Sequence, residues 1–345
     1  MSQAPACFKG WCMPVRGQMK IVVLDADPAF GSGGAANRPI LAPIDAPSLF
    51  ELGDVTTYAA TSPAQIVERA ADAEVLLTNK VPLCEEEFAA LPRLRLVSVL
   101  ATGVNVIDLA AAVRHGVTVC NVAGYSTAST AQHTFSLLLE LCQQVGLHAT
   151  AVNAGGWIAS PSFSFFKSQL VELDGLTMGV CGLGAIGQKV AIIAQAFGMK
   201  VIAFTRTPRD VPGVELVSKE RLLRSSDVVS LHCPLTEQTH HLIDDEALAL
   251  MKPEALLINV ARGPVMDEAA VARALAEERL AGLATDVLSE EPPRADNPLL
   301  CSPRCIITPH IAWATTAARK RLIALSVENI VQFYRGTPKN VVAEP

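Results

Sequence analysis

The fold of this chain is decided by residues 177–187, which read TMGVCGLGAIG. The first five of these residues predict a strand, and the helical pattern of residues 188–197 follows the glycines. A G-x-G-x-x-G motif between a strand and a helix indicates a dinucleotide-binding loop. Its first glycine makes the tight turn, its second lets the backbone approach the pyrophosphate, and its third allows close helix–strand packing. We therefore expect a pyrophosphate to bind at the helix N-terminus, through Gly182, Gly184, Ala185, Ile186 and Gly187.

Strands and helices alternate on both sides of this loop. Strands are expected before it at residues 21–24, 55–58, 75–78, 96–100 and 117–120, and helices at 63–71, 85–91, 107–115 and, mostly buried, 129–147. From the loop onward, strands are expected at residues 177–181, 200–205, 228–232, 255–260, 283–286 and 305–308, and a final helix at 315–334. This alternation predicts an α/β fold with two doubly wound parallel sheets. About half of the chain precedes the glycine loop, so we expect the cofactor domain to be inserted in the middle.

Length and composition are those of a globular protein with two domains. The chain has 345 residues, of which 50% are hydrophobic and 18% are charged, and roughly 150 residues make a typical domain. The net charge of -6 argues against a nucleic-acid partner, and no apolar run approaches the roughly 20 residues that span a bilayer. Residues 1–18 lack the apolar run of a signal peptide and are expected to form a loose tail. Nine cysteines without a Cys-x-x-Cys pair indicate reduced thiols, so we expect a cytoplasmic protein.

Further motifs carry a resemblance to a known family. They read LATGVN at 100–105, GYST at 124–127, QHT at 132–134, HCPLT at 232–236, NVARG at 259–263, DVLSEEPP at 286–293 and PHIAW at 309–313. With the glycine loop, they make the chain resemble the D-isomer-specific 2-hydroxyacid dehydrogenases, and most of all the glycerate dehydrogenase/hydroxypyruvate (glyoxylate) reductase group. The resemblance extends from Met19 to Val342.

The resemblance implies a domain organisation and an activity. Residues 19–120 and 309–345 would form a flavodoxin-like substrate domain, and residues 121–308 an inserted Rossmann domain. The active site would lie in the cleft between them, and the protein would be a homodimer. Such an enzyme transfers a hydride between NAD(P)H and a small 2-keto or D-2-hydroxy acid.

Reduction of a keto acid requires a cation for the carboxylate and an acid for the keto oxygen. Histidine suits the acid role because its ordinary pKa of about 6.5 is nearest to neutrality. The resemblance assigns this role to His310, with Glu291 as its partner and Arg262 as the carboxylate-binding cation. Glu291 is preferred to the adjacent Glu290 because it directly precedes Pro292. Backbone N–H groups of the loop at 101–104 are expected to bind the substrate, through Ala101, Thr102, Gly103 and Val104.

Other positions concern the cofactor. Asp286 is expected to receive the nicotinamide carboxamide. A second set is expected near the adenine, namely His232, Cys233 and Pro234. His133 is interpreted as a packing residue, and the mechanism requires no metal.

The segment after the expected strand at 200–205 predicts a preference for NADPH. NAD enzymes of this fold place an acid about 20 residues beyond the glycine loop, where this chain has Thr205. Arg206 is expected to bind the 2′-phosphate, with Thr205 and Thr207 as hydroxyl donors and Arg209 as a second charge. NAD stays possible if Asp210 reaches back to the ribose.

Three alternatives stay open. The substrate could be glyoxylate, hydroxypyruvate, phenylpyruvate or a bulkier keto acid, in a pocket that could include Phe163, Phe165, Phe166 and Trp313. A formate-type dehydrogenase is disfavoured because that related family has glutamine at the position of Glu291. A dinucleotide-sensing corepressor on the same scaffold is the alternative of a different class.

Overall fold

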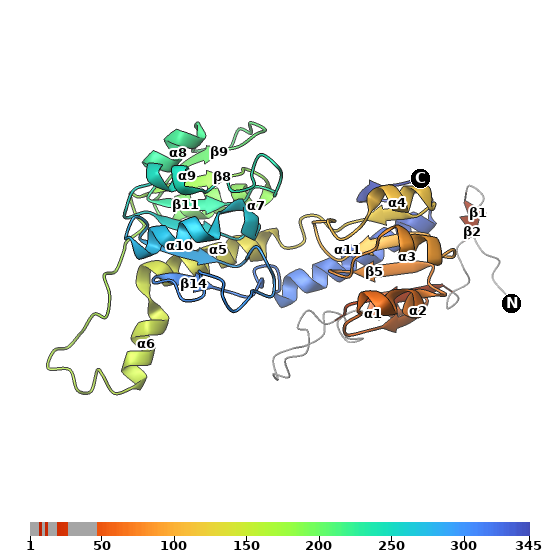
Figure 1. Ribbon diagram of the computed structural model, residues 1–345, viewed down its shortest axis with the longest axis horizontal. Helices are drawn as coiled ribbons and strands as arrows, with labels where there is room; N and C mark the ends of the chain where they lie inside the picture. The colour runs from red at the N-terminus through yellow and green to blue at the C-terminus, as the bar shows by residue number, and fades with distance from the viewer. Residues whose placement is uncertain (1–6, 9–10, 13–18, 27–46) are drawn as a thin grey trace. The chain divides into compact units, whose positions relative to one another are not determined.

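The computed structural model describes residues 7–8, 11–12, 19–26 and 47–345 (Figure 1). It divides the chain into two compact units, one of residues 1–125 with 316–345 and the other of residues 126–315. Among the described residues, no helix combines the length and the apolar character that crossing a membrane requires.

The first unit is built on a six-stranded sheet in the order β15-β7-β6-β5-β3-β4. The strands are β3 (Lys20–Val23), β4 (Asp54–Thr57), β5 (Val75–Thr78), β6 (Leu96–Val99), β7 (Thr118–Cys120) and β15 (Val341–Ala343). All neighbours are parallel except β15, which pairs antiparallel with β7. The helical elements are α1 (Pro47–Phe50), η1 (Pro63–Gln65), α2 (Ile66–Ala70), α3 (Glu85–Ala90), α4 (Leu109–Arg114) and α11 (Thr316–Tyr334). The structure therefore adds an antiparallel edge strand to a sheet that was expected to be parallel throughout.

The expected tail at residues 1–18 lies mostly outside the described residues. Within it, β1 (Cys7–Phe8) pairs antiparallel with β2 (Trp11–Cys12).

The second unit contains a seven-stranded parallel sheet in the order β10-β9-β8-β11-β12-β13-β14. Its strands are β8 (Thr177–Cys181), β9 (Lys200–Phe204), β10 (Val214–Leu216), β11 (Val228–Leu231), β12 (Leu256–Asn259), β13 (Gly282–Thr285) and β14 (Cys305–Ile307). Strands β9 and β10 are added on one side of β8 and strands β11 to β14 on the other, so the strand order reverses between β8 and β11. At such a switch point, ligands bind beyond the carboxyl ends of the strands. The predicted doubly wound architecture is confirmed, and β10 is a short strand that the sequence did not reveal.

Helices cover both faces of this sheet. One hydrophobic cluster joins α5 (Thr127–Gln143) and α7 (Ala185–Ala196) to the strands, and another joins α8 (Lys219–Ser225), α9 (Asp245–Leu250) and α10 (Glu268–Ala276) to them. A short helix, η2 (Gly263–Val265), follows β12.

The helix expected over residues 129–147 is two helices. Helix α5 ends at Gln143. The next residue, Gln144, takes the left-handed conformation with φ of 44°, and α6 (Val145–Asn153) begins directly after it. Helix α6 has no buried residue. Together with the loop that follows it, α6 projects from the sheet of the second unit as an arm (Figure 1). The single apolar run in the sequence therefore belongs to two elements, of which only α5 is a core helix.

Candidate active site

The glycine loop connects β8 to α7 and has room for a phosphate group. Gly182 has φ of 96°, and a Cβ there would lie 2.6 Å from the backbone nitrogen of Cys233. A Cβ at Gly187 would lie 2.1 Å from the carbonyl oxygen of Gly182. A Cβ at Gly184 would meet nothing within 4 Å, so the space in front of the α7 N-terminus is open. Ala185 and Ile186 form the first turn of α7, where free N–H groups favour an anion. The loop thus fits the pyrophosphate of a dinucleotide.

The segment after β11 forms the neighbouring wall of this loop. The His232 N–H donates to the Cys181 carbonyl at 2.7 Å, and the His232 Nε2 lies 2.8 Å from the Ser230 hydroxyl. Burial lowers the pKa of His232 to about 3 and raises the pKa of the Cys233 thiol to about 11. Both side chains are therefore uncharged near neutral pH. Together with Pro234 they can offer a cofactor contact surface but no charge.

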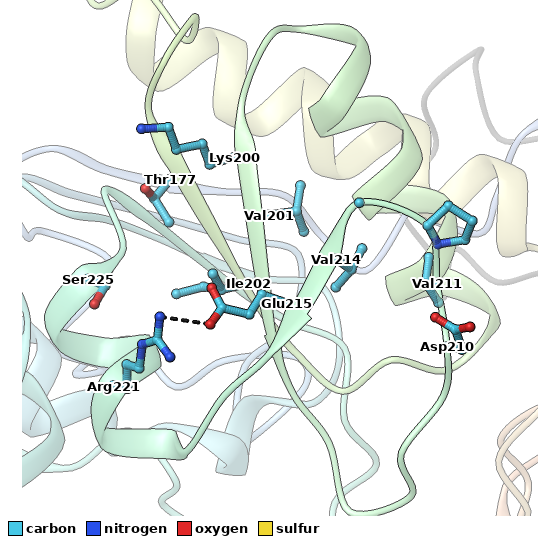
Figure 2. Close-up of a pocket in the computed structure, with 12 residues that line it drawn as sticks. Thr177, Lys200, Val201, Ile202, Asp210, Val211, Val214, Glu215, Arg221 and Ser225 are labelled. Atoms are coloured by element: carbon cyan, nitrogen blue, oxygen red, sulfur yellow. Dashed lines mark ion pairs between the residues drawn. The ribbon is translucent and has the colours of Figure 1, made fainter.

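The segment after β9 carries the residues predicted to bind a 2′-phosphate. The Thr205 hydroxyl donates to the Thr207 carbonyl at 3.3 Å. Arg206 and Arg209 are exposed, and neither forms an ion pair with another described residue. The next residue, Asp210, lines a hollow of about 680 Å³ together with Lys200, the first residue of β9 (Figure 2).

This hollow is not at the candidate active site. It contains the first residues of three strands, namely Thr177 of β8, Lys200 of β9 and Val214 of β10. Gly182 follows the carboxyl end of β8, whose five residues separate it from the amino end by roughly 16 Å. Figure 2 also shows the ion pair between Arg221 and Glu215, 2.8 Å long, at the edge of the hollow. The hollow therefore lies at the amino edge of the sheet, opposite the glycine loop.

The catalytic pair expected from the sequence is in direct contact. The His310 Nδ1 lies 2.6 Å from Oε2 of Glu291. Because an ionised carboxylate only accepts hydrogen bonds, Nδ1 carries a proton and Nε2 is left as the nitrogen for proton exchange. The side chains of His310 and Glu291 are 25% and 34% exposed, so a small molecule can reach them. The structure places Glu291, and not Glu290, against the histidine.

Arg262 follows the carboxyl end of the neighbouring strand β12. The buried Asn259 side chain shapes this turn, because it accepts from the Ala261 N–H at 3.0 Å and donates to the Arg262 carbonyl at 2.9 Å. The exposed Arg262 guanidinium donates to the Ala261 carbonyl at 2.7 Å. A Cβ at Gly263 would lie 2.0 Å from the backbone carbon of Leu288. The glycine therefore lets the Arg262 loop pack against the loop that carries Glu291.

Glu268 is a contact of the Glu291 loop that sequence reasoning missed. Its carboxylate accepts from the Ser289 N–H at 2.6 Å and from the Asn297 side chain at 2.7 Å. It lies in the first turn of α10, where an acidic residue is also common because its charge interacts favourably with the helix dipole. No local pattern in the sequence distinguishes the two roles.

His310 has an unusual backbone conformation, with φ of 54°. For a residue other than glycine this conformation costs on the order of 1–3 kcal/mol, so the surroundings must impose it. Asp286 does so. Its carboxylate accepts from the Ile311 N–H at 2.9 Å and the Ala312 N–H at 2.8 Å, and its carbonyl accepts from the His310 N–H at 2.9 Å.

The Asp286 carboxylate is almost wholly buried, with 1% of the side chain exposed. Burial raises the pKa of Asp286, but hydrogen bonds from His133, Thr308, Ala312 and Ile311 outweigh it, and the pKa lies below its ordinary value. The carboxylate is therefore ionised and faces protein donors. Its expected contact with a nicotinamide carboxamide stays a prediction.

Sequence reasoning treated His133 as packing, but the structure gives it polar partners. Its Nε2 lies 2.9 Å from the Thr308 hydroxyl and 3.4 Å from the Asp286 carboxylate. The signal in the sequence was a histidine beside the buried positions of a helix. Its partner Thr308, 175 residues later, could not be found from the sequence alone.

The remaining candidates belong to other segments of the chain. Residues 101–104 belong to the first unit, where they follow β6 and Thr102 donates its hydroxyl to the Val122 carbonyl at 3.2 Å. Phe163 and Phe166 are exposed on the arm of the second unit. In the described ranges, no three His, Cys, Asp or Glu side chains are grouped to hold a metal ion.

Comparison with known proteins identifies the family. Residues 135–312 match the model of the D-isomer specific 2-hydroxyacid dehydrogenase, NAD binding domain. A hydroxypyruvate reductase of Blautia hydrogenotrophica is 41% identical over 332 residues, which is 94% of this chain and 99% of that protein. A glycerate dehydrogenase of Methylorubrum extorquens is 40% identical over 284 residues, or 81% of this chain and 89% of that protein.

A solved structure of a named protein has a similar fold. It is an acyclic imino acid reductase in complex with NADPH and D-Arg, with a TM-score of 0.81 and 27% identity. The match covers 94% of this chain and 100% of the other. The protein described here belongs to the D-isomer-specific 2-hydroxyacid dehydrogenase family and is a nicotinamide-dependent oxidoreductase that acts on CH–OH donors.

Proposed function

We propose that the protein reduces hydroxypyruvate or glyoxylate, and oxidises the corresponding 2-hydroxy acid in reverse, with His310 as the general acid/base. The observation that carries the proposal is the 2.6 Å contact between His310 and Glu291. It lies beyond the carboxyl ends of the same sheet that bears the glycine loop. The relatives named hydroxypyruvate reductase and glycerate dehydrogenase support this choice of substrate.

Each residue has a separate task in the proposed mechanism. A bound nicotinamide cofactor supplies the hydride that adds to the C2 carbon of the keto acid. His310 donates its Nε2 proton to the keto oxygen, so that the C=O group becomes CH–OH. Glu291 orients the ring and stabilises its positive charge. Arg262 binds the substrate carboxylate. A contribution of the loop at residues 101–104 to substrate binding stays a prediction.

A turnover assay tests the proposal directly. NADPH oxidation is measured with hydroxypyruvate, glyoxylate and phenylpyruvate, and the substrates are ranked by kcat/KM. We expect one of the two small keto acids to rank first. A first rank for phenylpyruvate would replace the substrate, and binding of NADPH without turnover of any keto acid would favour a dinucleotide sensor.

We propose further that NADPH is preferred to NADH. No carboxylate lies at residues 205–209, the segment that directly follows β9, and the next residue, Asp210, lines the hollow shown in Figure 2. Arg206 and Arg209 are exposed and available for a 2′-phosphate. A tenfold preference requires about 1.4 kcal/mol, less than a hydrogen bond to a charged group can contribute, about 1.5–3 kcal/mol.

The cofactor proposal is tested by kcat/KM for NADPH and NADH with one keto acid. The wild type is expected to favour NADPH, and Arg206→Ala to lose most of that preference. Arg224→Ala removes an exposed arginine of α8 and serves as the control with an unchanged ratio. A wild type that uses NADH equally well would contradict the proposal.

We also propose a homodimer that forms through the arm. Helix α6 has no buried residue, and in the loop after it Ile158 and Phe163 are 93% and 89% exposed. Large apolar side chains that are exposed on one segment are typical of a protein–protein contact, and an isologous pairing of two arms would cover them. Light scattering at micromolar concentration should give twice the mass of the chain. The Ile158→Glu/Phe163→Glu variant should be monomeric, and Val67→Glu, at an exposed position of the first unit, should remain a dimer.

The cytoplasm is the proposed location. The seven cysteines from Cys84 to Cys305 are free thiols, which agrees with a reducing compartment. Cell fractionation with an antibody against the protein tests this location.

A further inference from the structure

A cluster of polar side chains joins helix α5 to the ends of strands β13 and β14. Asp286 follows β13, Thr308 follows β14, and His133 lies near the middle of α5. The Thr308 hydroxyl lies 2.6 Å from Oδ1 of Asp286 and 2.9 Å from Nε2 of His133. The three side chains therefore form one connected hydrogen-bond network.

The directions of these hydrogen bonds follow from the proton inventory. Thr308 has one hydroxyl proton, which it donates to the Asp286 carboxylate. Its oxygen must therefore accept from His133, so Nε2 of His133 carries a proton. The same His133 Nε2 atom lies 3.4 Å from Oδ1 of Asp286. His133 thus supports the carboxylate both directly and through Thr308.

The supported carboxylate holds the backbone on which His310 lies. Its two oxygens bind the N–H groups of Ile311 and Ala312, directly after the left-handed His310. Helix α5 makes a second contact with this loop, because the Ser129 hydroxyl donates to the Ala312 carbonyl. The conformation of the candidate acid is therefore connected, through Asp286, to a helix that contributes no group to the proposed reaction.

We propose that His133 is a positioning residue, whose Nε2–H holds the Asp286 carboxylate in place and thereby keeps His310 in the geometry for proton transfer. This inference rests on the proposed role of His310 as general acid/base. His133 does not touch the substrate or cofactor in this proposal. Its hydrogen bond to Asp286 is among the causes that keep the pKa of that carboxyl low despite burial.

The function of the N–H can be separated from the volume of the ring. His133→Phe keeps a ring of similar size and removes the donor, which leaves Asp286 and Thr308 with one donor fewer. We expect kcat to fall roughly tenfold, equivalent to about 1.4 kcal/mol, with an unchanged Kd for NADPH. His133→Gln can place an amide N–H near the position of Nε2 and is expected to recover most of kcat. A packing role would instead lower the melting temperature of both variants and leave kcat of the folded protein unchanged.

Two further variants complete the experiment. Thr308→Val preserves shape and removes the hydroxyl, so it should lower kcat as His133→Phe does, and it gives an independent test if the latter does not fold. Ser136→Ala, at an exposed position of α5 whose hydroxyl bonds only the Gln132 carbonyl among the described residues, should leave kcat unchanged.

The outcomes separate this inference from the proposed function. Wild-type kcat in both His133→Phe and Thr308→Val would overturn the positioning role while leaving the reaction intact. An equal loss in His133→Phe and His133→Gln would also overturn it, because the N–H would then not matter. A wild type without keto-acid turnover would overturn the proposed function itself.

Discussion

The substitution Glu291→Gln isolates the charge of the carboxylate that faces His310. Glutamine keeps the length and shape of the side chain and can still accept one hydrogen bond from Nδ1. In the wild type that contact is 2.6 Å long and joins a carboxylate to the ring. The variant therefore preserves orientation and removes the negative charge that stabilises a protonated ring.

The magnitude follows from the difference between charged and neutral hydrogen bonds. A hydrogen bond to a charged group contributes about 1.5–3 kcal/mol and a neutral one about 0.5–1.5 kcal/mol. The difference, about 1–1.5 kcal/mol, corresponds to a roughly 5- to 15-fold change in rate. Because the two side chains are 25% and 34% exposed, water weakens the charge effect, and we expect the lower half of that range.

The assay is the steady-state rate of NADPH oxidation with hydroxypyruvate, with kcat and KM determined separately. We expect kcat to fall and the Kd for NADPH to stay unchanged. Glu290→Gln is a matched control, because it removes the same charge one residue away at an exposed position. Unchanged kcat in Glu291→Gln, or an equal loss in Glu290→Gln, would refute the assignment.

Three other expectations follow from the same site, and a fourth concerns the N-terminal tail. His310→Ala should lower kcat by roughly 10²–10⁴-fold with cofactor affinity nearly intact by fluorescence titration, and wild-type rates would contradict its role as the acid. Arg262→Ala should raise KM and lower kcat, since the guanidinium would bind the carboxylate in both the ground and the transition state; steady-state kinetics checks this. Because the pKa of Asp286 in the fold lies below its ordinary value of 3.8, the ionised carboxylate stabilises the protein above that pH, and this contribution is lost as the pH falls further. Urea unfolding across this acid range should show a weaker pH dependence of the free energy of unfolding for Asp286→Asn, and an equal dependence would contradict the network. Deletion of residues 1–18 should leave turnover and melting temperature unchanged, and a fall of more than a few degrees would show that the tail packs on the body.

Buried parallel strands were predictable because their residues carry a continuous apolar signal. β8 occupies the predicted residues 177–181, and all four residues of β11 and of β12 are buried. The strands β10 and β15 were not predicted; each lies at an edge of its sheet, and neither has a buried residue. The end of α5 before Gln144 was not predictable either, because no sequence pattern marks a glutamine that takes the left-handed conformation.

The sequence by itself determined the family, the glycine loop and the identity of the candidate acid and its partner. These features are local: a strand–glycine–helix transition, and motifs whose side chains follow strand ends. Only the tertiary structure decided which groups hold that acid in place. Asp286 and Thr308 follow separate strands, and His133 lies on a helix 175 residues before Thr308. Their hydrogen bonds depend on how α5 packs against the sheet. The sequence alone does not show which residues of the helix and of the strand ends come within hydrogen-bonding distance.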